Sequence, residues 1–300
     1  MHPLLGHTLE RIEARDARAG AQLRKFVEGA GPVYAARAQD FFSRFERFLQ
    51  SQGRSFDYGI ECYLKLRETM AWEEMKFLRT GQYSNRSFAE VAERVYRNPD
   101  VMEYHLYGLV LAQFLWPDQY HRFSFFCEHF PEYAPDIRRY LEIGGGHGLY
   151  AHQAALTLGG RARVDVVDIS PSSMELARAM LDGLPVSFYL TDIFDFAPEG
   201  VYDFITMGEV LEHLEDPLAM LKRVRELLAP KGHAYITTPA NSAMIDHIYL
   251  FNNANEIRET LAAGGFRIEK EASMYAKSMP AAQAEALKVA LMYAAFVEPR

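Results

Sequence analysis

Cysteine is almost absent from this sequence of 300 residues, which contains only Cys62 and Cys127. Two cysteines can form neither a disulfide framework nor a four-sulfur metal site, and such usage is typical of a reduced cytoplasmic setting. No apolar run approaches the eighteen residues of a membrane span, and the first twenty residues lack the apolar region of a secretory signal. We therefore expect a cytoplasmic chain with no membrane partner.

An excess of basic residues is also lacking, because the net charge is −8. Residues 1–138 contain 18 Lys and Arg against 19 Asp and Glu, which leaves 14 against 21 for residues 139–300. Neither part presents a basic face that would collect phosphates. We therefore expect no nucleic-acid partner, and a small molecule is the better expectation for the substrate.

What the sequence does contain is an aromatic-rich first part, since 24 of its 39 aromatic residues precede residue 137. Apolar residues there recur at helical spacing, for example Phe41, Phe42, Phe45 and Phe48. The pattern predicts an all-α domain over residues 1–137. Plain core packing explains such aromatic stripes, but their number also suits a lid over a substrate pocket or a homodimer interface.

The second part alternates short β-branched runs with helical stretches, which indicates a doubly wound α/β sheet. Ligands of such sheets bind beyond the carboxyl ends of the strands. The predicted strands are Arg139–Ile143, Arg163–Val167, Pro185–Leu190, Tyr202–Met207, His233–Thr238, Phe266–Ala272 and Val289–Val297. The predicted helices are Leu149–Leu158, Ser172–Leu181, Pro217–Ala229, Glu256–Ala263 and Ala281–Leu287.

A glycine-rich turn follows the first predicted strand, with the sequence Gly144-Gly145-Gly146-His147-Gly148. Glycines let the backbone turn sharply and approach a ligand closely. Asp168 ends the next strand, twenty residues beyond Gly148, where a carboxylate can accept hydrogen bonds from ribose hydroxyls. A dinucleotide-binding dehydrogenase satisfies this much of the pattern. A Walker-type phosphate loop does not, because no Gly-Lys-Ser/Thr follows.

Two further acidic motifs follow the third and fourth strands. Asp192 is placed to accept from the amine of an adenine, and Glu209-Val210-Leu211-Glu212-His213 follows the next strand. The sequence Glu142-x-Gly144-x-Gly146-x-Gly148, with these acids in this order, resembles the class I S-adenosylmethionine-dependent methyltransferases. The likeness is greatest to the small-molecule enzymes of ubiquinone and menaquinone biosynthesis, and it covers residues 138–300.

The resemblance implies a Rossmann-like sheet of seven strands, the last of them reversed, over a catalytic domain of residues 138–300. It also implies S-adenosylmethionine as cofactor and S-adenosylhomocysteine as product. The residues that it assigns to the cofactor are Glu142, Gly144, Gly146, Gly148, Asp168, Ile169, Asp192, Ile193 and Glu209. His147 departs from the small polar residue usual in the family, and it is expected to contact the methionine end or the substrate, or to cap the following helix.

Catalysis at an oxygen acceptor needs a group that removes a proton, and histidine is suited to this near neutral pH. His213 and His247 fall in loops after the fourth and fifth strands, and Glu209 lies near the entering substrate. Each histidine could instead cap a helix or bond a neighbouring backbone group. The resemblance of Glu209-x-x-Glu212-His213 to the metal motif of some methyltransferases leaves a cation open, but we expect catalysis without a metal.

The sequence thus predicts methyl transfer to a small molecule, at oxygen in preference to nitrogen or carbon, in specialised or quinone-like metabolism. Two alternatives stay open at this point. One is a protein- or carrier-bound acceptor, which Arg11, Arg15, Arg18, Arg24 and Lys25 would help to recognise. The other is a non-catalytic scaffold or sensor that binds the cofactor, because a fold alone does not establish turnover.

Overall fold

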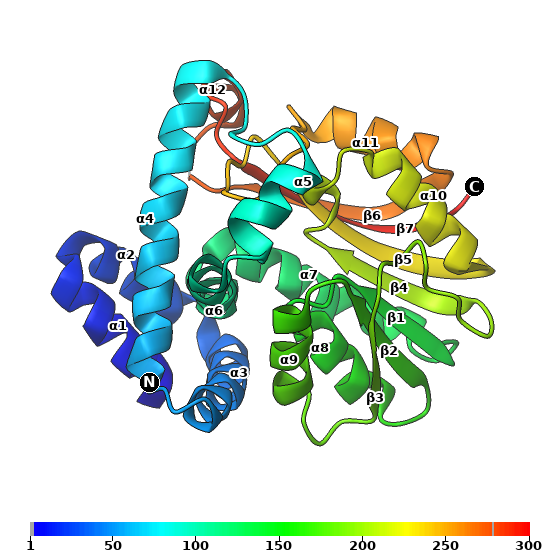
Figure 1. Ribbon diagram of the computed structural model, residues 1–300, viewed down its shortest axis with the longest axis horizontal. Coiled ribbons are helices and arrows are strands. Elements are labelled where there is room, and N and C mark those ends of the chain that lie inside the picture. Colours follow the sequence, from blue (N-terminus) through cyan, green and yellow to red (C-terminus); the bar gives the residue numbers. More distant parts are fainter. Residues whose placement is uncertain (1–2, 278) are drawn as a thin grey trace.

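The computed structural model describes residues 3–277 and 279–300. Its first part consists of helices, which lie to one side of the sheet (Figure 1). Among them α4 is a single long helix of 25 residues, with α1 and α2 on its outer side in Figure 1. The elements are α1 (Pro3–Arg15), α2 (Ala17–Gly29), α3 (Gly31–Ser51), α4 (Phe56–Thr80), α5 (Phe88–Val91), the π-helix η1 (Ala92–Tyr96), α6 (Pro99–Leu115) and α7 (Pro117–Tyr133).

Local sequence signals set the ends of these helices. The Asn98 side chain accepts from the amide of Val101, and Pro99 occupies the first turn of α6, where its missing N–H costs nothing. Gly81 ends α4 in the left-handed conformation, with a φ of 71°. The chain between Gly81 and α6 thereby turns back toward the sheet.

The second part is a seven-stranded sheet in the order β3-β2-β1-β4-β5-β7-β6. The first five strands are parallel, and β7 pairs antiparallel with both β5 and β6. This confirms the predicted fold class, including the reversed last strand. The strands are β1 (Arg139–Ile143), β2 (Arg163–Asp168), β3 (Val186–Leu190), β4 (Tyr202–Gly208), β5 (Leu228–Ala240), β6 (Phe266–Tyr275) and β7 (Leu291–Pro299).

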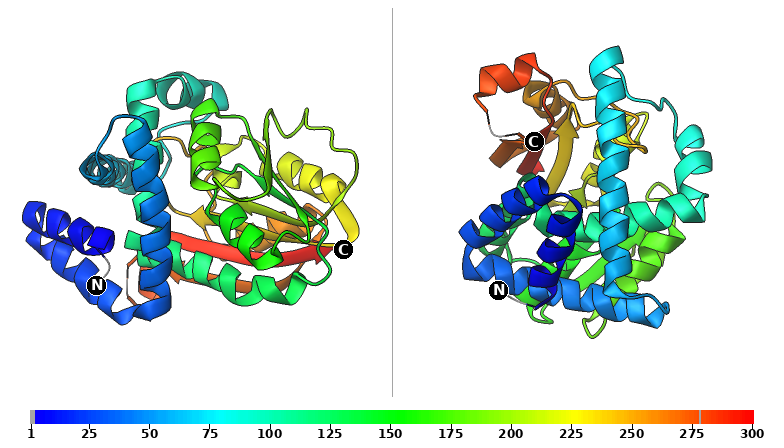
Figure 2. Two further views of the ribbon diagram at one scale, coloured as in Figure 1. Left: turned by 90° about the horizontal axis from the view of Figure 1, so that it is seen from below. Right: turned by 90° about the vertical axis from the view of Figure 1, so that its left-hand side faces the viewer.

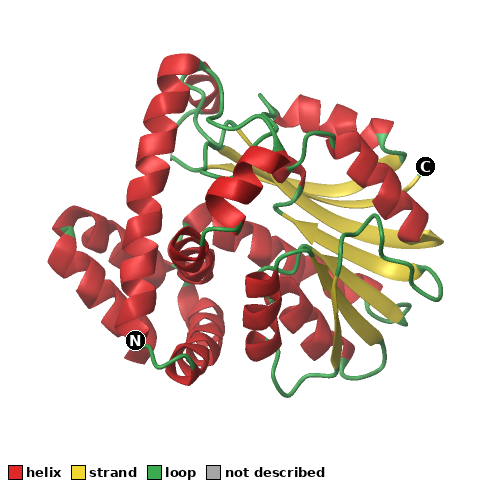
Figure 3. Ribbon diagram, viewed as in Figure 1, coloured by secondary structure: helices red, strands yellow, loops and turns green. Residues whose placement is uncertain are grey.

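Helices cover both faces of this sheet (Figure 3). The predicted helices are all present, with ends that shift by one or two residues, as α8 (Leu149–Leu158), α9 (Pro171–Met180), α10 (Pro217–Leu227), α11 (Ala254–Ala263) and α12 (Ala281–Ala286). One prediction was wrong in extent. The fifth strand begins at Leu228 and not at His233, because Leu228 pairs with Tyr202 across an irregularity in the register of β4 and β5.

The two parts of the chain share one hydrophobic core. A continuous cluster runs from Leu5 and Phe42 in the first helices to Tyr140 and Phe296 in the sheet. Helix α7 carries much of this contact, since the ring of Phe126 stacks on that of Phe296 with centroids 6.3 Å apart. Figure 2 shows the first helices packed beside the α/β part. The roles of residues 1–137 as a lid or dimer interface, and of residues 138–300 as the catalytic domain, remain predictions.

No helix within the described residues is both long enough and apolar enough to cross a membrane.

Candidate active site

The backbone conformation of the turn after β1 depends on its glycines. Gly144 has a φ of 68° and Gly146 a φ of 53°, a region that favours glycine. A Cβ at Gly144 would lie 2.6 Å from Cγ2 of Val210. Gly148, also with a positive φ, begins α8. The backbone amides at this helix start are therefore close to the carboxyl ends of the strands, as the prediction for the three glycines requires.

Two acids, Asp168 and Glu142, accept hydrogen bonds from backbone amides in and beside this turn. Asp168 accepts hydrogen bonds from the amides of Gly146 and Ser170, at 3.1 and 2.7 Å, and its burial raises the pKa of the carboxyl. Glu142 is buried and accepts from the amide of Ala151 in α8, and burial raises its pKa to about 8. Both acids order the turn, and Asp168 is the more accessible of the two.

An apolar rim lies beside the turn, at the ends of β2 and β3. Ile169 and Phe194 are about half exposed, at 52% and 50%. Between them in sequence, Asp192 accepts from the amide of Phe194, and Ile193 is buried. The predicted adenine-reading residues thus lie on adjacent strand ends, with apolar surface available for a flat ring.

His147 caps the helix that follows the turn. Its Nδ1 accepts from the amide of Leu149 at 3.3 Å, and its ring meets Phe41 of α3 edge-on. Burial lowers the pKa of this imidazole to about 4, so that it is neutral near pH 7. Of the roles expected for His147, helix capping is the one for which the structure provides a contact.

Glu209 follows β4 in a left-handed conformation, with a φ of 56°. Its carboxylate accepts from Oγ1 of Thr237 at 2.9 Å and forms an ion pair with Arg122. Non-glycine residues in this conformation are uncommon and gather at functional sites. The side chain of Glu209 is thereby held between the sheet and helix α7.

Arg122 is the site residue that sequence reasoning missed. It is 1% exposed, it comes from α7, and its Nε and Nη2 have no hydrogen-bond partner among the described residues. Burial alone would lower the pKa of its guanidinium, but the Glu209 carboxylate outweighs that effect and the pKa is raised. In the sequence, Arg122 is a single arginine within the aromatic run that ends the helical part. That position alone does not distinguish Arg122 from a surface residue.

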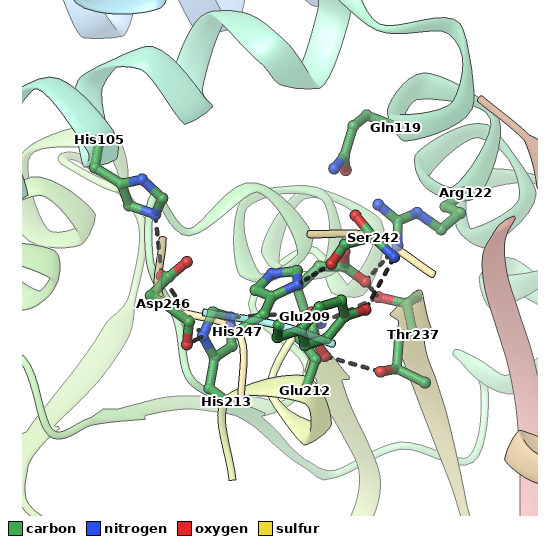
Figure 4. A network of polar contacts seen from close by, with 12 residues as sticks. His105, Gln119, Arg122, Glu209, Glu212, His213, Thr237, Ser242, Asp246 and His247 are labelled. Atoms are coloured by element: carbon green, nitrogen blue, oxygen red, sulfur yellow. Dashed lines mark hydrogen bonds and ion pairs between the residues drawn. The ribbon is translucent and has the colours of Figure 1, made fainter. Parts of the chain in front are cut away.

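Three ligand-type side chains converge beside Glu209, as Figure 4 shows. Glu212, His213 and His247 each offer an atom, and these atoms lie within 4.8 Å of one another. The carboxylate of Glu212 is fully buried, with Oε2 accepting from Thr238 and with no partner for Oε1 in the described part of the chain. Burial first, and the charge of Glu209 second, raise the pKa of this carboxyl.

The protons of both imidazoles are placed by backbone carbonyls. Nδ1 of His213 lies 3.1 Å from the carbonyl of Asp246, and Nδ1 of His247 lies 2.7 Å from that of Ser242. A carbonyl only accepts, so each Nδ1 carries a hydrogen, and in the neutral form of either ring the lone pair is on Nε2. Burial also lowers the pKa of His247 to about 3, which keeps its imidazole neutral.

Residues of the helical part contact the loop after β5, which carries Ser242 and His247. The Asn85 side chain donates to the carbonyls of Ile245 and His247, and the Tyr83 hydroxyl accepts from the amide of Ser242. The Tyr96 hydroxyl of η1 lies 3.2 Å from Nδ1 of His213. Residues far apart in sequence therefore build one site, and those of the helical part carried no motif that sequence reasoning could use.

The profile of the methyltransferase domain family matches residues 114–279, more than half of the chain. The chain belongs to this methyltransferase family. With its fold and strand-end residues, it is a class I S-adenosylmethionine-dependent methyltransferase, and S-adenosylmethionine is its cofactor. The match begins within α6 and includes Arg122, so the family extends beyond the 138–300 range that the sequence resemblance covered.

Curated relatives of this methyltransferase include the ubiquinone biosynthesis O-methyltransferase of Vibrio campbellii, 29% identical over 137 residues, or 44% of this chain and 57% of the relative. The enzyme of that name from Xanthomonas axonopodis pv. citri is 34% identical over 108 residues, or 35% of this chain and 44% of the relative. The methyltransferase thus spans about half the length of the curated relatives that it matches.

Solved structures show the same fold. The mitomycin 7-O-methyltransferase MmcR aligns with a TM-score of 0.51 at 17% identity, over 76% of this methyltransferase and 68% of that chain. The plantazolicin methyltransferase BpumL, in complex with a substrate analogue and S-adenosylhomocysteine, aligns with a TM-score of 0.52 at 16% identity, over 71% and 96%. Identities this low show the fold and not the substrate.

Proposed function

We propose that this chain transfers the methyl group of S-adenosylmethionine to an oxygen of a small molecule. The observation that carries the proposal is the convergence of Glu212, His213 and His247 beside Glu209 and Arg122, at the carboxyl ends of β4 and β5. The names of the curated relatives, which are O-methyltransferases of ubiquinone biosynthesis, support an oxygen acceptor of quinone-like chemistry.

The cofactor is proposed to lie over the glycine turn. Asp168 receives the ribose hydroxyls, and Asp192 with Ile169 and Ile193 receives the adenine. The methionine end of the cofactor carries a carboxylate, and Arg122 offers two buried donors that lack a partner. Because an unpaired buried donor is costly, a carboxylate at Arg122 would remove that cost and gain charge-assisted hydrogen bonds. Glu142 and Glu209 support this pocket through Ala151 and Arg122.

The acceptor is proposed to bind near the Nε2 atoms of His213 and His247. A hydroxyl is a poor nucleophile until its proton is removed, and a neutral imidazole with a free lone pair can accept it. One ring nitrogen of each histidine and a carboxylate oxygen of Glu212 lie within 4.8 Å of one another, and Nε2 of His213 is 3.9 Å from Oε1 of Glu212. Alignment of the acceptor oxygen with the methyl group then provides much of the rate enhancement.

The same three side chains also fit a divalent cation. Two neutral imidazoles and a buried carboxylate form a typical ligand set, and backbone carbonyls hold both rings as outer-shell partners usually do. A bound cation would lower the pKa of an acceptor hydroxyl and hold that oxygen in place. The sequence predicts catalysis without a metal; on this geometry we propose instead that Glu212, His213 and His247 hold a cation. The lone pairs of the two imidazoles would then bind the cation, and their role as proton acceptors belongs to the metal-free mechanism alone.

Calorimetry and product analysis together test the proposal. S-Adenosylmethionine should bind the whole chain, and a catechol derivative, offered as an ortho-diphenol probe, should gain one methyl group at oxygen. Treatment with EDTA should abolish turnover while cofactor binding persists, and Mn²⁺ or Mg²⁺ should restore it. Cofactor binding without methylation of phenols, anilines or thiols would favour the sensor alternative. Undiminished turnover in EDTA would restore the metal-free mechanism.

The carrier-bound acceptor gains no support from the first helices. Arg11 lies 3.6 Å from both Asp57 and Glu61, and Arg24 pairs with Glu13 at 2.6 Å. These charges are already partnered within the chain. The basic face that would meet an acidic carrier is therefore partly neutralised, and the small-molecule acceptor remains the proposal.

A further inference from the structure

Beneath the proposed acceptor site lies a buried carboxylate that no step above uses. Asp246 is 3% exposed, and Figure 4 shows it between two imidazoles. One of its oxygens, Oδ2, is 3.1 Å from Nε2 of His105 and 3.5 Å from Nδ1 of His213. His105 belongs to α6 in the helical part and is itself 3% exposed.

We propose that Asp246 and His105 are positioning residues that fix the ring and the tautomer of His213. This inference rests on the proposed function, because it assigns a purpose to the orientation of a residue placed in that site. Asp246 acts on His213 through its backbone carbonyl, which accepts the hydrogen bond of Nδ1, and through its carboxylate, whose Oδ2 lies 3.5 Å from the same nitrogen. Nε2 of His213 is thereby left with a lone pair, facing Oε1 of Glu212 at 3.9 Å.

The role of His105 in this arrangement is to give the buried carboxylate of Asp246 a partner. A buried carboxylate without hydrogen bonds is costly, and Oδ1 of Asp246 has none within the described residues. A hydrogen on Nε2 of His105 points the donor of that ring at Oδ2, and Nδ1 of His105 has no partner among the described residues. The contacts from His105 to Asp246 to His213 therefore place a nitrogen donor on each side of one carboxylate.

The loop that carries Asp246 is fixed from the helical part as well. Arg94 and Asn85 donate to the carbonyl of Ile245, at 3.2 and 2.8 Å. Asp246 therefore follows a residue whose backbone is anchored, and His105 contacts its side chain from a neighbouring helix. The helical part would in this way set the geometry of an imidazole that is carried by the α/β part.

Nitrogen NMR of the histidine rings tests this directly, on metal-free protein without acceptor at pH 8. In the wild type, Nδ1 of His213 should have the shift of a protonated nitrogen and Nε2 that of a bare one. The His105→Phe and Asp246→Asn variants should show a mixture of tautomers, because only the backbone carbonyl of Asp246 then remains to hold the Nδ1 hydrogen. His105→Gln, which keeps a donor at that position, should retain most of the wild-type pattern.

Mn²⁺ titration gives a second readout on the same proteins. Loss of an outer-shell partner typically weakens metal affinity by about 10- to 100-fold, so we expect such a decrease for His105→Phe and Asp246→Asn. His105→Gln should lie close to the wild type. His129→Phe removes a histidine of α7 outside this network and should change neither readout. Cofactor affinity, measured for each variant, checks that the rest of the fold is intact.

The wild-type spectrum alone can overturn the inference. A bare Nδ1 on His213 would exclude donation to Asp246, whether or not any variant folds. Unchanged tautomer in both His105→Phe and Asp246→Asn would also overturn it. If Mn²⁺ binds none of the proteins but the tautomer responds as expected, the proposed metal fails while the positioning role stands.

Discussion

Arg122 joins helix α7 to Glu209 at the end of β4, where we propose that the methionine end of the cofactor binds. Replacement by Lys keeps the charge but removes the planar fork that suits a carboxylate. We expect Arg122→Lys to bind S-adenosylmethionine roughly 10- to 100-fold more weakly, which corresponds to the loss of a charge-assisted pair worth about 1.5–3 kcal/mol. Calorimetry measures this, with the exposed Arg79→Lys as a matched control.

Arg122→Gln should weaken binding further, because it also leaves Glu209 without its ion-pair partner. Unfolding in urea separates this loss from a general loss of stability. Equal cofactor affinity in the wild type, Arg122→Lys and Arg122→Gln would show that the carboxylate of the cofactor lies elsewhere.

Asp168 distinguishes the cofactor from a dinucleotide. We expect Asp168→Ala to abolish measurable S-adenosylmethionine binding, because it removes the proposed acceptor for the ribose hydroxyls and frees the amides of Gly146 and Ser170. Asp168→Asn should retain part of the affinity. Asp195→Ala, an exposed acid nearby in sequence, is the control. Binding of NAD to the wild type, with no binding of S-adenosylmethionine or S-adenosylhomocysteine, would contradict the assignment.

At the scale of an element, the glycine turn requires a positive φ and also free space where a Cβ would lie. Two variants can test these requirements separately. Ala at Gly144 meets both a positive φ and Cγ2 of Val210 at 2.6 Å, whereas Ala at Gly159 meets a positive φ of 56° with no atom within 4 Å. Strain in such a conformation costs on the order of 1–3 kcal/mol. We expect both variants to lose stability in urea, but only Gly144→Ala to lose cofactor affinity as well.

The opposite result is equally informative. If Gly159→Ala weakens cofactor binding as much as Gly144→Ala, the effect comes from α8 as a whole. The close approach at the turn would then not be the feature that matters.

Local pattern was sufficient to predict the sheet and most of its helices. Alternation and caps such as Ser170-Pro171 act over a few residues, so the sequence displays them directly. The extension of β5 back to Leu228 depends on pairing with Tyr202 across the sheet, which no window of sequence contains. Strand-end residues such as Asp168 and Glu209 could be found because the fold fixes where strands end.

The residues that come from the helical part could not be found in this way. Arg122, His105 and Asn85 reach the site through tertiary packing, and each lies on or before a helix whose pattern signals only a buried face. Helix α7 also belongs by composition to the helical part, yet its Phe126 stacks on β7. Composition divides the chain at residue 137, whereas the hydrophobic core does not divide there.

At the scale of the whole molecule, His152 lies where the two parts meet and makes their packing sensitive to pH. It comes from α8, its side chain is 7% exposed, and its Nε2 is 3.5 Å from Asp40 of α3. Burial first, and the charge of Arg44 second, lower its pKa to about 4, although Asp40 opposes this. The folded protein therefore resists protonation of a group that the unfolded chain protonates near pH 6.5.

The sign of the effect follows from proton binding. Between pH 6.5 and 4 the unfolded state holds more protons at His152, so the free energy of unfolding falls as the pH falls. Other groups titrate in this range, but they are common to the wild type and to His152→Gln and cancel in the difference. We expect the stability of the wild type relative to His152→Gln to decrease by up to about 3 kcal/mol from pH 7.5 to 4, as measured by urea unfolding. A difference that stays constant with pH would show that the histidine is hydrated in the folded protein, and that the two parts pack less tightly there than the burial of His152 requires.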